Sequence, residues 1–352
     1  LYFKYANFLV DNVNDLINAL GAEPVSWTKI ALPIGISFFT FQKLSYSIDV
    51  YRNVHGPLKK LQDYALYIIL FPQLIAGPIV RFHEIADQIE DRQHNENVDN
   101  RLLGFFRFII GLAKKVLIAN TLGEQVDAIF ALQDGQLGTG VAWIGIVAYS
   151  FQIYYDFSGY SDMAIGMGRM IGFKFPENFN NPYISQNITE FWRRWHMTLG
   201  RWMKDYLYIP LGGSRVQTKR RLYFNLWLVF LISGLWHGSA WNFVVWGAYH
   251  GLFLVLDRLF LAKLLSSGGR IFSVVFTYLA TLVGWVLFRA ESSDQIRYFL
   301  KAMFSHQNQI VKQDLGIEFW FFMLLGGFFS FFALKKGVEK WQDTILSEPV
   351  RF

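Results

Sequence analysis

The sequence predicts an all-α integral membrane protein that crosses the bilayer several times. Of its 352 residues, 53% are hydrophobic and 18% aromatic, whereas only 17% are charged. Soluble domains carry roughly 25% charged residues, so this composition is typical of a chain embedded in lipid. The stretch from Leu222 to Leu256 contains no Asp, Glu, Lys or Arg, as a hydrocarbon environment selects. Proline and glycine interrupt other apolar segments, which predicts broken and re-entrant helices around a central tunnel.

Composition also excludes several kinds of site. The chain has no cysteine, so disulfides, thiolate metal sites and a cysteine nucleophile are excluded. The net charge of +6 is modest, and we assign it to Lys and Arg in cytoplasmic loops. We therefore expect the lipid bilayer, and no nucleic acid, as a partner. The chain starts at Leu1 in apolar sequence, and we expect this to be a cut through a longer protein with further N-terminal spans.

The N-terminal third alternates between apolar and polar segments. Residues 1–20 predict a short or truncated helix, and residues 30–50 a broken or tilted one after Pro33 and Gly35. Residues 64–80 contain three helix breakers, which predicts backbone that lines a cavity or is covered by protein. Residues 83–101 are polar and predict a soluble loop or surface helix.

Positive charges interrupt the apolar segment from Leu102 to Leu122. Arg107, Lys114 and Lys115 lie within it and would be costly at the middle of a bilayer. They must snorkel, lie at an interface or face an interior anion, and we expect them to snorkel.

The remaining spans are predicted at residues 138–157, 272–288 and 319–334, and a glycine-rich helix follows the first of them at residues 158–173. Residues 176–182 (PENFNNP) predict a turn. Leu222–Leu256 is too long for one crossing and slightly short for two, at about 1.5 Å per residue. We therefore expect a break near Trp236, His237 and Gly238, and eight to ten membrane segments in all.

The segment from Asn187 to Tyr208 predicts an amphipathic helix with Asn187 as its N-cap. Too many charges lie on its polar face for it to span a membrane, so it should lie in the interface or line a wet cavity. His196 lies at the edge of its apolar face. A membrane anchor with His196 as a boundary residue would explain this segment equally well. The apolar face comprises Ile188, Phe191, Trp195, Leu199, Trp202 and Tyr206.

Two histidines in aromatic surroundings, His196 and His237, are the candidate chemical groups. An ionisable side chain inside an apolar run predicts function, although His237 could instead be a satisfied core histidine. The spacing does not predict a metal site, because there is no HxxxH or HExxH pattern. No GxSxG elbow is present for a serine nucleophile. A histidine general base remains, and with an apolar tunnel it suits acyl transfer from a thioester. His196 or an indole N–H could then bind the oxyanion.

Five long segments are the most distinctive parts of the chain: Gly35–Arg52, Leu74–Glu84, Asp156–Phe173 (DFSGYSDMAIGMGRMIGF), Pro176–Gly213 and Ser233–Gly251 (SGLWHGSAWNFVVWGAYHG). These segments resemble the membrane-bound O-acyltransferase family, in its bacterial branch that acetylates polysaccharides such as alginate. The resemblance runs in order along nearly the whole chain and implies a single acyltransferase domain over residues 1–352.

The resemblance implies roles for both histidines. His237 in GLWHG matches the catalytic histidine of the family, and His196 in RRWH matches its second site. Acetyl-CoA or another acyl thioester is implied as a cytoplasmic donor substrate, with no bound cofactor. The implied partners are an extracytoplasmic acetyltransferase and a polysaccharide acceptor, at a bacterial inner membrane. We also expect the following residues to contact substrate or line the tunnel: Trp192, Arg194, Trp195, Trp236, Asn181 and Asp205.

Two other functions stay open on the sequence. D-alanyl transfer to teichoic acid is the first, because that branch shares RWHMTL-type and NFN-type segments, although YIPLGG at Tyr208–Gly213 favours the alginate-type branch. A proton-coupled transporter or flippase is the second, since broken helices and intramembrane histidine occur there too. We find no repeated halves in the sequence, which favours the enzyme. A purely structural scaffold would leave the long motifs unexplained.

Overall fold

A computed structural model describes residues 1–74, 77–305 and 314–347, and these form helices and loops without a β-strand. The all-α prediction is therefore confirmed. The α-helices are α1 (Tyr2–Ala19), α2 (Ile36–Tyr51), α3 (Leu61–Ile69), α4 (Phe82–Glu90), α5 (Val98–Ala113), α6 (Thr121–Phe130), α7 (Thr139–Met170), α8 (Ile188–Arg194), α9 (Met197–Met203), α10 (Lys219–His237), α11 (Trp241–Leu256), α12 (Ala262–Ser267), α13 (Arg270–Arg289), α14 (Ser293–Phe304), α15 (Gly316–Phe331) and α16 (Val338–Ser347).

Short π and 3-10 segments extend or connect these helices. The π segments are η3 (Lys114–Asn120), η5 (Lys204–Tyr208) and η6 (Asp257–Leu261), and the 3-10 segments are η1 (Phe71–Gln73), η2 (Gln93–Asn95), η4 (Pro182–Ile184) and η7 (Phe332–Leu334).

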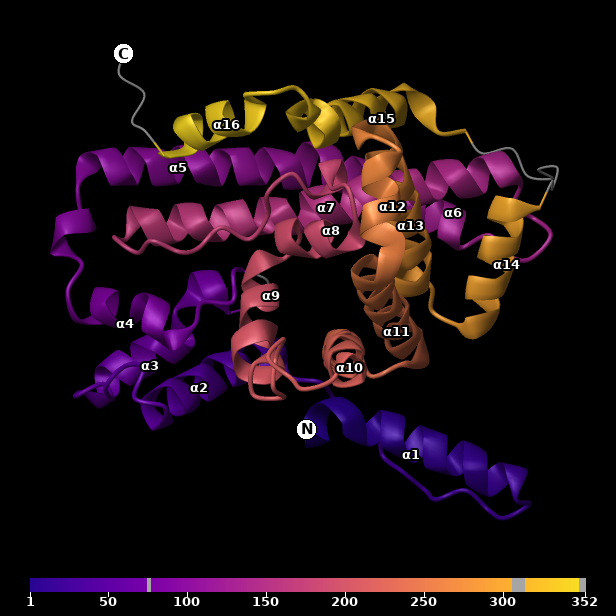
Figure 1. Cartoon of the computed structure of the whole chain (residues 1–352), viewed down its shortest axis with the longest axis horizontal. Helices are drawn as coiled ribbons and strands as arrows, with labels where there is room; N and C mark the ends of the chain where they lie inside the picture. Colours follow the sequence, from indigo (N-terminus) through magenta and orange to yellow (C-terminus); the bar gives the residue numbers. More distant parts are fainter. Residues whose placement is uncertain (75–76, 306–313, 348–352) are drawn as a thin grey trace.

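Helices α5 and α7 lie side by side and form the long axis of the molecule (Figure 1). Glycines allow the two helices to approach closely. A Cβ added to Gly111 would lie only 2.4 Å from the carbonyl oxygen of Gly159, so there is no room for a side chain at this position. We predicted two helices in this region, at residues 138–157 and 158–173, but α7 is one helix of 32 residues. No proline interrupts it, and its glycines Gly159 and Gly166 serve contact with α5 instead of ending the helix.

The positive charges on the α5 and η3 segments face the protein interior. Arg107 is 7% exposed and donates from Nε to Asp162 Oδ1 at 2.8 Å. Lys114 Nζ lies 2.6 Å from the other oxygen of the same carboxylate, and Lys115 pairs with Asp156. The prediction that these residues snorkel was wrong, because carboxylates on α7 neutralise them where α7 packs against α5 and η3.

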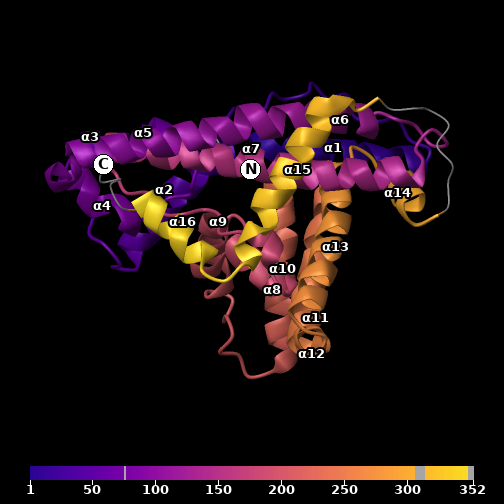
Figure 2. The same ribbon diagram turned by 90° about the horizontal axis from the view of Figure 1, so that it is seen from above.

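A second group of helices projects away from the α5–α7 layer and contains α10, α11 and α13 (Figure 2). Helix α10 ends at His237 and α11 begins at Trp241, so the predicted break in the uncharged stretch is confirmed. Close to the break, α10 and α11 cross where Gly234 lies against Gly247. A Cβ on Gly234 would lie 3.1 Å from the Cα of Gly247 and 2.2 Å from the carbonyl oxygen of Phe243.

Three helices in the described part of the chain are long and apolar enough to cross a membrane: Trp241–Ser267, Arg270–Arg289 and Gly316–Leu334. This number is below the eight to ten segments that we predicted. The other apolar segments are shorter, or they carry buried polar and charged side chains, as α5 does with Arg107 and α7 with Asp162.

The N-terminal helices α2, α3 and α4 pack together around Tyr67 and Phe82, both fully buried. The three predicted helix breakers, Pro72, Gly77 and Pro78, are also buried, so protein covers the backbone around them, which is one of the two predicted environments. Ile69 and Phe71 in the same segment are exposed, and residues 75–76 lie outside the described residues. Helix α1 lies apart from the main body, next to the end of α10 (Figure 1).

Candidate functional site

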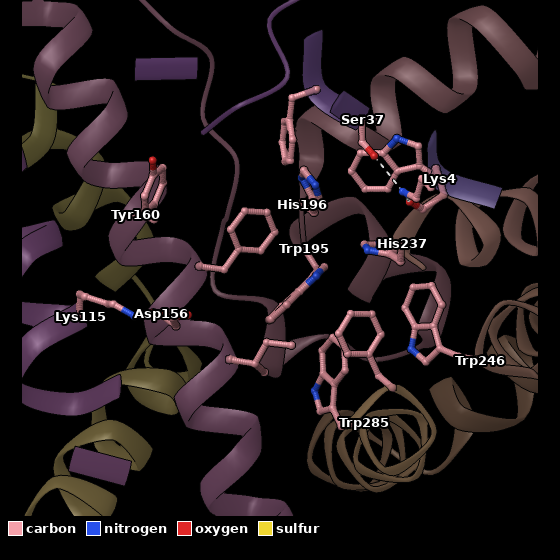
Figure 3. A pocket seen from close by; sticks show the side chains of 15 residues that line it. Lys4, Ser37, Lys115, Asp156, Tyr160, Trp195, His196, His237, Trp246 and Trp285 are labelled. Atoms are coloured by element: carbon pink, nitrogen blue, oxygen red, sulfur yellow. Dashed lines mark hydrogen bonds and ion pairs between the residues drawn. The ribbon is translucent and has the colours of Figure 1, made fainter. Parts of the chain in front are cut away.

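A cavity of about 370 Å³ lies among α2, α7, α10, α11, α13 and the link between α8 and α9, and Figure 3 shows the side chains that line it. Both candidate histidines line it, so the structure brings His196 and His237 to one space although they lie on different helices. Aromatic side chains make up most of its wall. The lining residues are Lys4, Ser37, Phe38, Lys115, Ile153, Asp156, Phe157, Tyr160, Trp195, His196, Trp236, His237, Trp246, Trp285 and Phe288.

His196 lies at a break in the helix that we predicted to be continuous from Asn187 to Tyr208. Its backbone is left-handed, with φ 44° and ψ 52°, and it separates α8 from α9. Non-glycine residues adopt this conformation rarely and at some cost. The continuous helix was therefore a wrong prediction. The N-cap was right, because the Asn187 side chain accepts from the N–H of Glu190 at 2.8 Å.

The apolar face of this segment is buried despite the break. All six predicted members are at most 8% exposed. They divide among three hydrophobic clusters, with Phe191 in one, Ile188 in another and Leu199 in a third. The periodicity therefore predicted which residues are buried, but not how the backbone turns between them.

Asn178 fixes the conformation at the His196 break. Its side-chain Oδ1 accepts from the backbone N–H of Thr198 at 3.2 Å, from Thr198 Oγ1 at 2.8 Å and from His196 Nδ1 at 3.0 Å. Its Nδ2 donates to Ser161 Oγ on α7 at 3.0 Å. Asn178 is 1% exposed, so these bonds form in a buried place where each is worth more than in water.

These bonds define the tautomer of His196. A backbone N–H can only donate, so the Asn178 atom that faces Thr198 is the amide oxygen. That oxygen can only accept, and the Nδ1 of His196 must therefore carry a hydrogen. In the neutral ring, Nε2 is then left with a free lone pair. His196 is thus positioned as a hydrogen-bond acceptor at the cavity.

His237 is held differently, by ring contacts at the last residue of α10. The helix ends there because Gly238 is extended, with φ −160° and ψ 153°. The His237 ring packs edge to face on Trp236, Trp246 and Phe288, with centroids 4.9, 5.0 and 5.4 Å away. In the described chain, neither ring nitrogen of His237 has a hydrogen-bond partner. Figure 3 shows one of them pointing into the cavity.

The wall opposite His237 carries polar groups from α7. Asp156 and Tyr160 lie one turn apart on this helix, and Asp156 pairs with Lys115 of η3 (Figure 3). The ring of Phe157 lies between them and His196, 4.7 Å from the imidazole and edge to face. The cavity therefore combines an apolar aromatic surface with a few polar groups, as small-molecule sites commonly do.

Two of the predicted tunnel residues line this cavity. Trp236 contacts both histidine rings, at 6.3 Å from His196 and 4.9 Å from His237. Trp195 directs its indole nitrogen toward the space beside His237 (Figure 3). It is therefore placed as a hydrogen-bond donor for a group in the cavity.

Two others lie behind the cavity wall or at the surface. Trp192 packs on the rings of Trp246 and His250, at 5.4 and 4.9 Å. Arg194 donates to Glu190 at 2.9 Å and to Glu339 at 2.6 Å. Neither residue is among those that line the cavity with the histidines.

Asn181 and Asp205 lie at separate places. Asn181 lines a second cavity of about 330 Å³ and donates to Gln342 at 2.9 Å. Asp205 pairs with Arg81, which also binds Glu84 at 2.7 Å. Burial acts to raise the pKa of the Glu84 carboxyl, but the Arg81 guanidinium outweighs burial and lowers that pKa. Asp205 therefore belongs to an ion-pair cluster, and a substrate contact for it stays a prediction.

Sequence reasoning missed Asn178, Lys4, Asp156 and Tyr160. Asn178 was visible only as part of a turn in PENFNNP, since nothing in the local sequence links it to a histidine 18 positions later. Asp156 and Tyr160 lie in the segment Asp156–Phe173, which carries part of the family resemblance but did not indicate a site residue. Lys4 lies in a helix without any motif. Its position in the cavity depends on tertiary packing alone.

Comparisons with known proteins match most of the chain to one family. Residues 29–264 match the model of MBOAT, the membrane-bound O-acyltransferase family. Over 304 residues the chain is 51% identical to the "Probable alginate O-acetylase AlgI" of Azotobacter vinelandii, covering 86% of this chain and 60% of that protein. It is 40% identical over 330 residues to the "Peptidoglycan O-acetyltransferase" of Helicobacter pylori, with 86% and 62% covered. Over 240 residues it is 29% identical to the "Teichoic acid D-alanyltransferase" of Bacillus subtilis, with 64% and 59% covered.

The chain spans about three fifths of the length of the curated relatives it matches. The family model covers well over half of the chain, including both histidines, the Asn178 turn and the break between α10 and α11. This chain belongs to the membrane-bound O-acyltransferase family.

Proposed function

We propose that this protein is a membrane O-acetyltransferase that uses His237 as its general base. The observation that carries the proposal is the shared cavity, in which His196 and His237 face one aromatic space. Relatives at 51% and 40% identity bear the names of O-acetylating enzymes, which supports acetyl as the transferred group. The apolar lining suits a short acyl chain, and the few polar groups suit a reacting carbonyl and hydroxyl.

We propose a different task for each histidine. His237 takes the proton from an acceptor hydroxyl, because its ring nitrogens are not occupied by protein groups within the described residues. His196 offers a fixed lone pair on Nε2 and orients that hydroxyl or a water molecule. A neutral His196 in this tautomer cannot donate to an oxyanion from Nε2. The indole N–H of Trp195 can donate to a group in the cavity, as His196 Nε2 cannot.

The remaining features of the function are proposals. We propose acetyl-CoA or another acyl thioester as a cytoplasmic donor, since a thiolate is a good leaving group whose thiol has a pKa of about 8.5. The proposed acceptor is an extracellular or cell-wall polysaccharide such as alginate, reached directly or through an extracytoplasmic acetyltransferase partner. We propose that the protein crosses the bacterial inner membrane several times. The three apolar helices support a membrane location.

D-alanyl transfer to teichoic acid is the second candidate. Its support is the 29% identity to a protein with that name over 64% of this chain. The O-acetylating relatives are more similar and cover more of the chain, so we rank acetyl transfer first. Membership in an acyltransferase family also favours an enzyme over a transporter or flippase. Transport in proteoliposomes without any acyl transfer would reverse that ranking.

Labelled donors test the proposal directly. Membranes that contain the protein are incubated with radiolabelled acetyl-CoA, and label in polysaccharide is compared with that from a D-alanyl carrier thioester. We expect acetyl incorporation that disappears with His237→Ala, while the amount of folded protein in the membrane stays the same. Normal polysaccharide acetylation by the His237→Ala protein would contradict the assignment. Transfer of D-alanyl alone would establish the second candidate.

A further inference from the structure

The ammonium group of Lys4 reaches the cavity from α1. Its Nζ donates to Ser37 Oγ at 2.8 Å and to the carbonyl oxygen of Trp236. Figure 3 shows Lys4 and Ser37 on the side of the cavity where His237 lies, away from Lys115 and Asp156. Lys4 thus places a positive charge beside the proposed base.

This charge lacks a protein counter-ion in residues 1–74, 77–305 and 314–347. Asp156 is the one carboxylate among the described residues that line the cavity, and it is bound to Lys115. Both acceptors of Lys4 are neutral oxygens. A partly buried ammonium without an anion is unfavourable, so its negative partner is expected in the substrate or in the transition state.

The geometry of Lys4 leaves room for that partner. An ammonium has three N–H donors, and Ser37 and the Trp236 carbonyl accept two of them. The third donor has no hydrogen-bond acceptor in the described structure, and the nearest π contact is the Trp236 ring, whose centroid lies 5.5 Å from Nζ. Because two fixed acceptors hold the group, little reorganisation is needed when charge develops nearby, which is the condition for strong electrostatic stabilisation.

Resting on the proposed acetyl transfer, we propose that Lys4 is a catalytic residue that stabilises the oxyanion of the tetrahedral intermediate. His237 takes the proton of the acceptor hydroxyl while its oxygen bonds to the thioester carbonyl carbon. The π electrons of the C=O bond move to the carbonyl oxygen, which accepts the third N–H of Lys4. When the C=O bond re-forms, the C–S bond breaks and the thiolate leaves, taking the proton from His237.

Lys4 also has a structural contact, and the test must separate the two roles. Carbonyl groups in the last turn of a helix lack partners within the helix. Tyr5 donates to the Leu235 carbonyl at 2.9 Å and Lys4 to the Trp236 carbonyl, so both cap the end of α10. Tyr5 does this without a charge. A role in capping alone therefore does not require the ammonium.

The experiment measures thiol release from acetyl-CoA by the membrane-embedded protein in the presence of alginate as the acceptor. We expect Lys4→Met and Lys4→Gln to lower kcat by about 100-fold, with KM for acetyl-CoA changed by less than about threefold. Lys4→Arg keeps a positive charge and should retain more activity than either neutral variant. Tyr5→Phe removes the neighbouring capping bond and is the matched control, with kcat expected close to that of the unmodified protein.

The outcomes are distinguishable when thermal unfolding is measured for each variant. Lys4→Gln keeps an N–H donor for the Trp236 carbonyl and replaces Lys4→Met if the latter does not fold. A folded neutral variant with a kcat within about threefold of the unmodified protein overturns the proposal. If both neutral variants fail to fold, Lys4 is a capping residue, and the proposal is also overturned. If the unmodified protein releases no thiol, the proposed function itself fails.

Discussion

The two helix breaks that carry the histidines are constructed in opposite ways. At the first, between α8 and α9, His196 has a left-handed backbone and a ring nitrogen bonded to Asn178. At the second, between α10 and α11, the backbone of His237 is helical, and its imidazole packs against aromatic rings without a hydrogen bond to a described protein group. One histidine is therefore fixed in a single tautomer, whereas the ring nitrogens of the other are free of protein hydrogen bonds within the described residues. A general base requires the second property, and an orienting group requires the first.

The largest expected effect comes from replacing each histidine by asparagine. His237→Asn removes the base and should lower kcat by about 10³-fold. His196→Asn should cost less, on the order of 10- to 100-fold, because asparagine tolerates the left-handed backbone and offers an amide oxygen as acceptor. The check is the rate of acetyl transfer from acetyl-CoA by both variants at equal protein levels. If His196→Asn is the more damaging of the two, the assigned roles are reversed.

A smaller effect is expected from Asn178→Ala. This change leaves His196 Nδ1 and the N–H of Thr198 without their acceptor, so the tautomer and orientation of the ring are no longer fixed. We expect kcat to fall by roughly 10- to 100-fold, as for other groups that orient a functional histidine. Stability should fall by about 1–3 kcal/mol, because buried polar groups lose a partner.

Two further variants test whether the loss of kcat in Asn178→Ala comes from the lost orientation of the His196 ring. Asn178→Asp keeps the acceptor oxygens and should recover most of the kcat lost in Asn178→Ala. Ser161→Ala removes the bond on the other side of the Asn178 amide and should change kcat by less than about threefold, since Oδ1 stays bonded to Thr198. Equal losses of kcat in Ser161→Ala and Asn178→Ala would mean that Asn178 acts only through local stability.

The smallest effect concerns the packing that supports the His237 break. In Gly234→Ala the new methyl group would meet the backbone of Phe243 at 2.2 Å, so α10 and α11 must move apart. We expect a loss of about 1–3 kcal/mol in the free energy of unfolding. Gly140→Ala is the matched control, because a Cβ there meets no atom within 4 Å, and it should not destabilise the protein. Thermal unfolding in detergent measures the stability of both variants. Equal unfolding temperatures for Gly234→Ala and Gly140→Ala would show that α10 and α11 are not closely packed where they cross.

The sequence predicted more of the site than of the backbone. Periodicity identified the buried face of residues 187–208, since burial of each side chain depends on its own polarity. It missed the interruption at His196, because that break is imposed by Asn178 from a distant turn. The length of the uncharged stretch predicted the break after His237 correctly, but glycine content misled at α7, where Gly159 serves contact with α5. Local sequence does not distinguish a glycine that ends a helix from one that admits a neighbour.

The sequence by itself determined the membrane class, the all-α fold, the two histidines and, through long motifs, the family. These depend on composition and on runs of adjacent residues. Only the tertiary structure decided that Arg107 and Lys114 pair with Asp162, that Asp205 and Asn181 lie away from the histidine cavity, and that Lys4 reaches it. The physical reason is that a buried charge or a histidine tautomer depends on partners brought together by folding. The position of such partners is not encoded in the neighbouring residues of the chain.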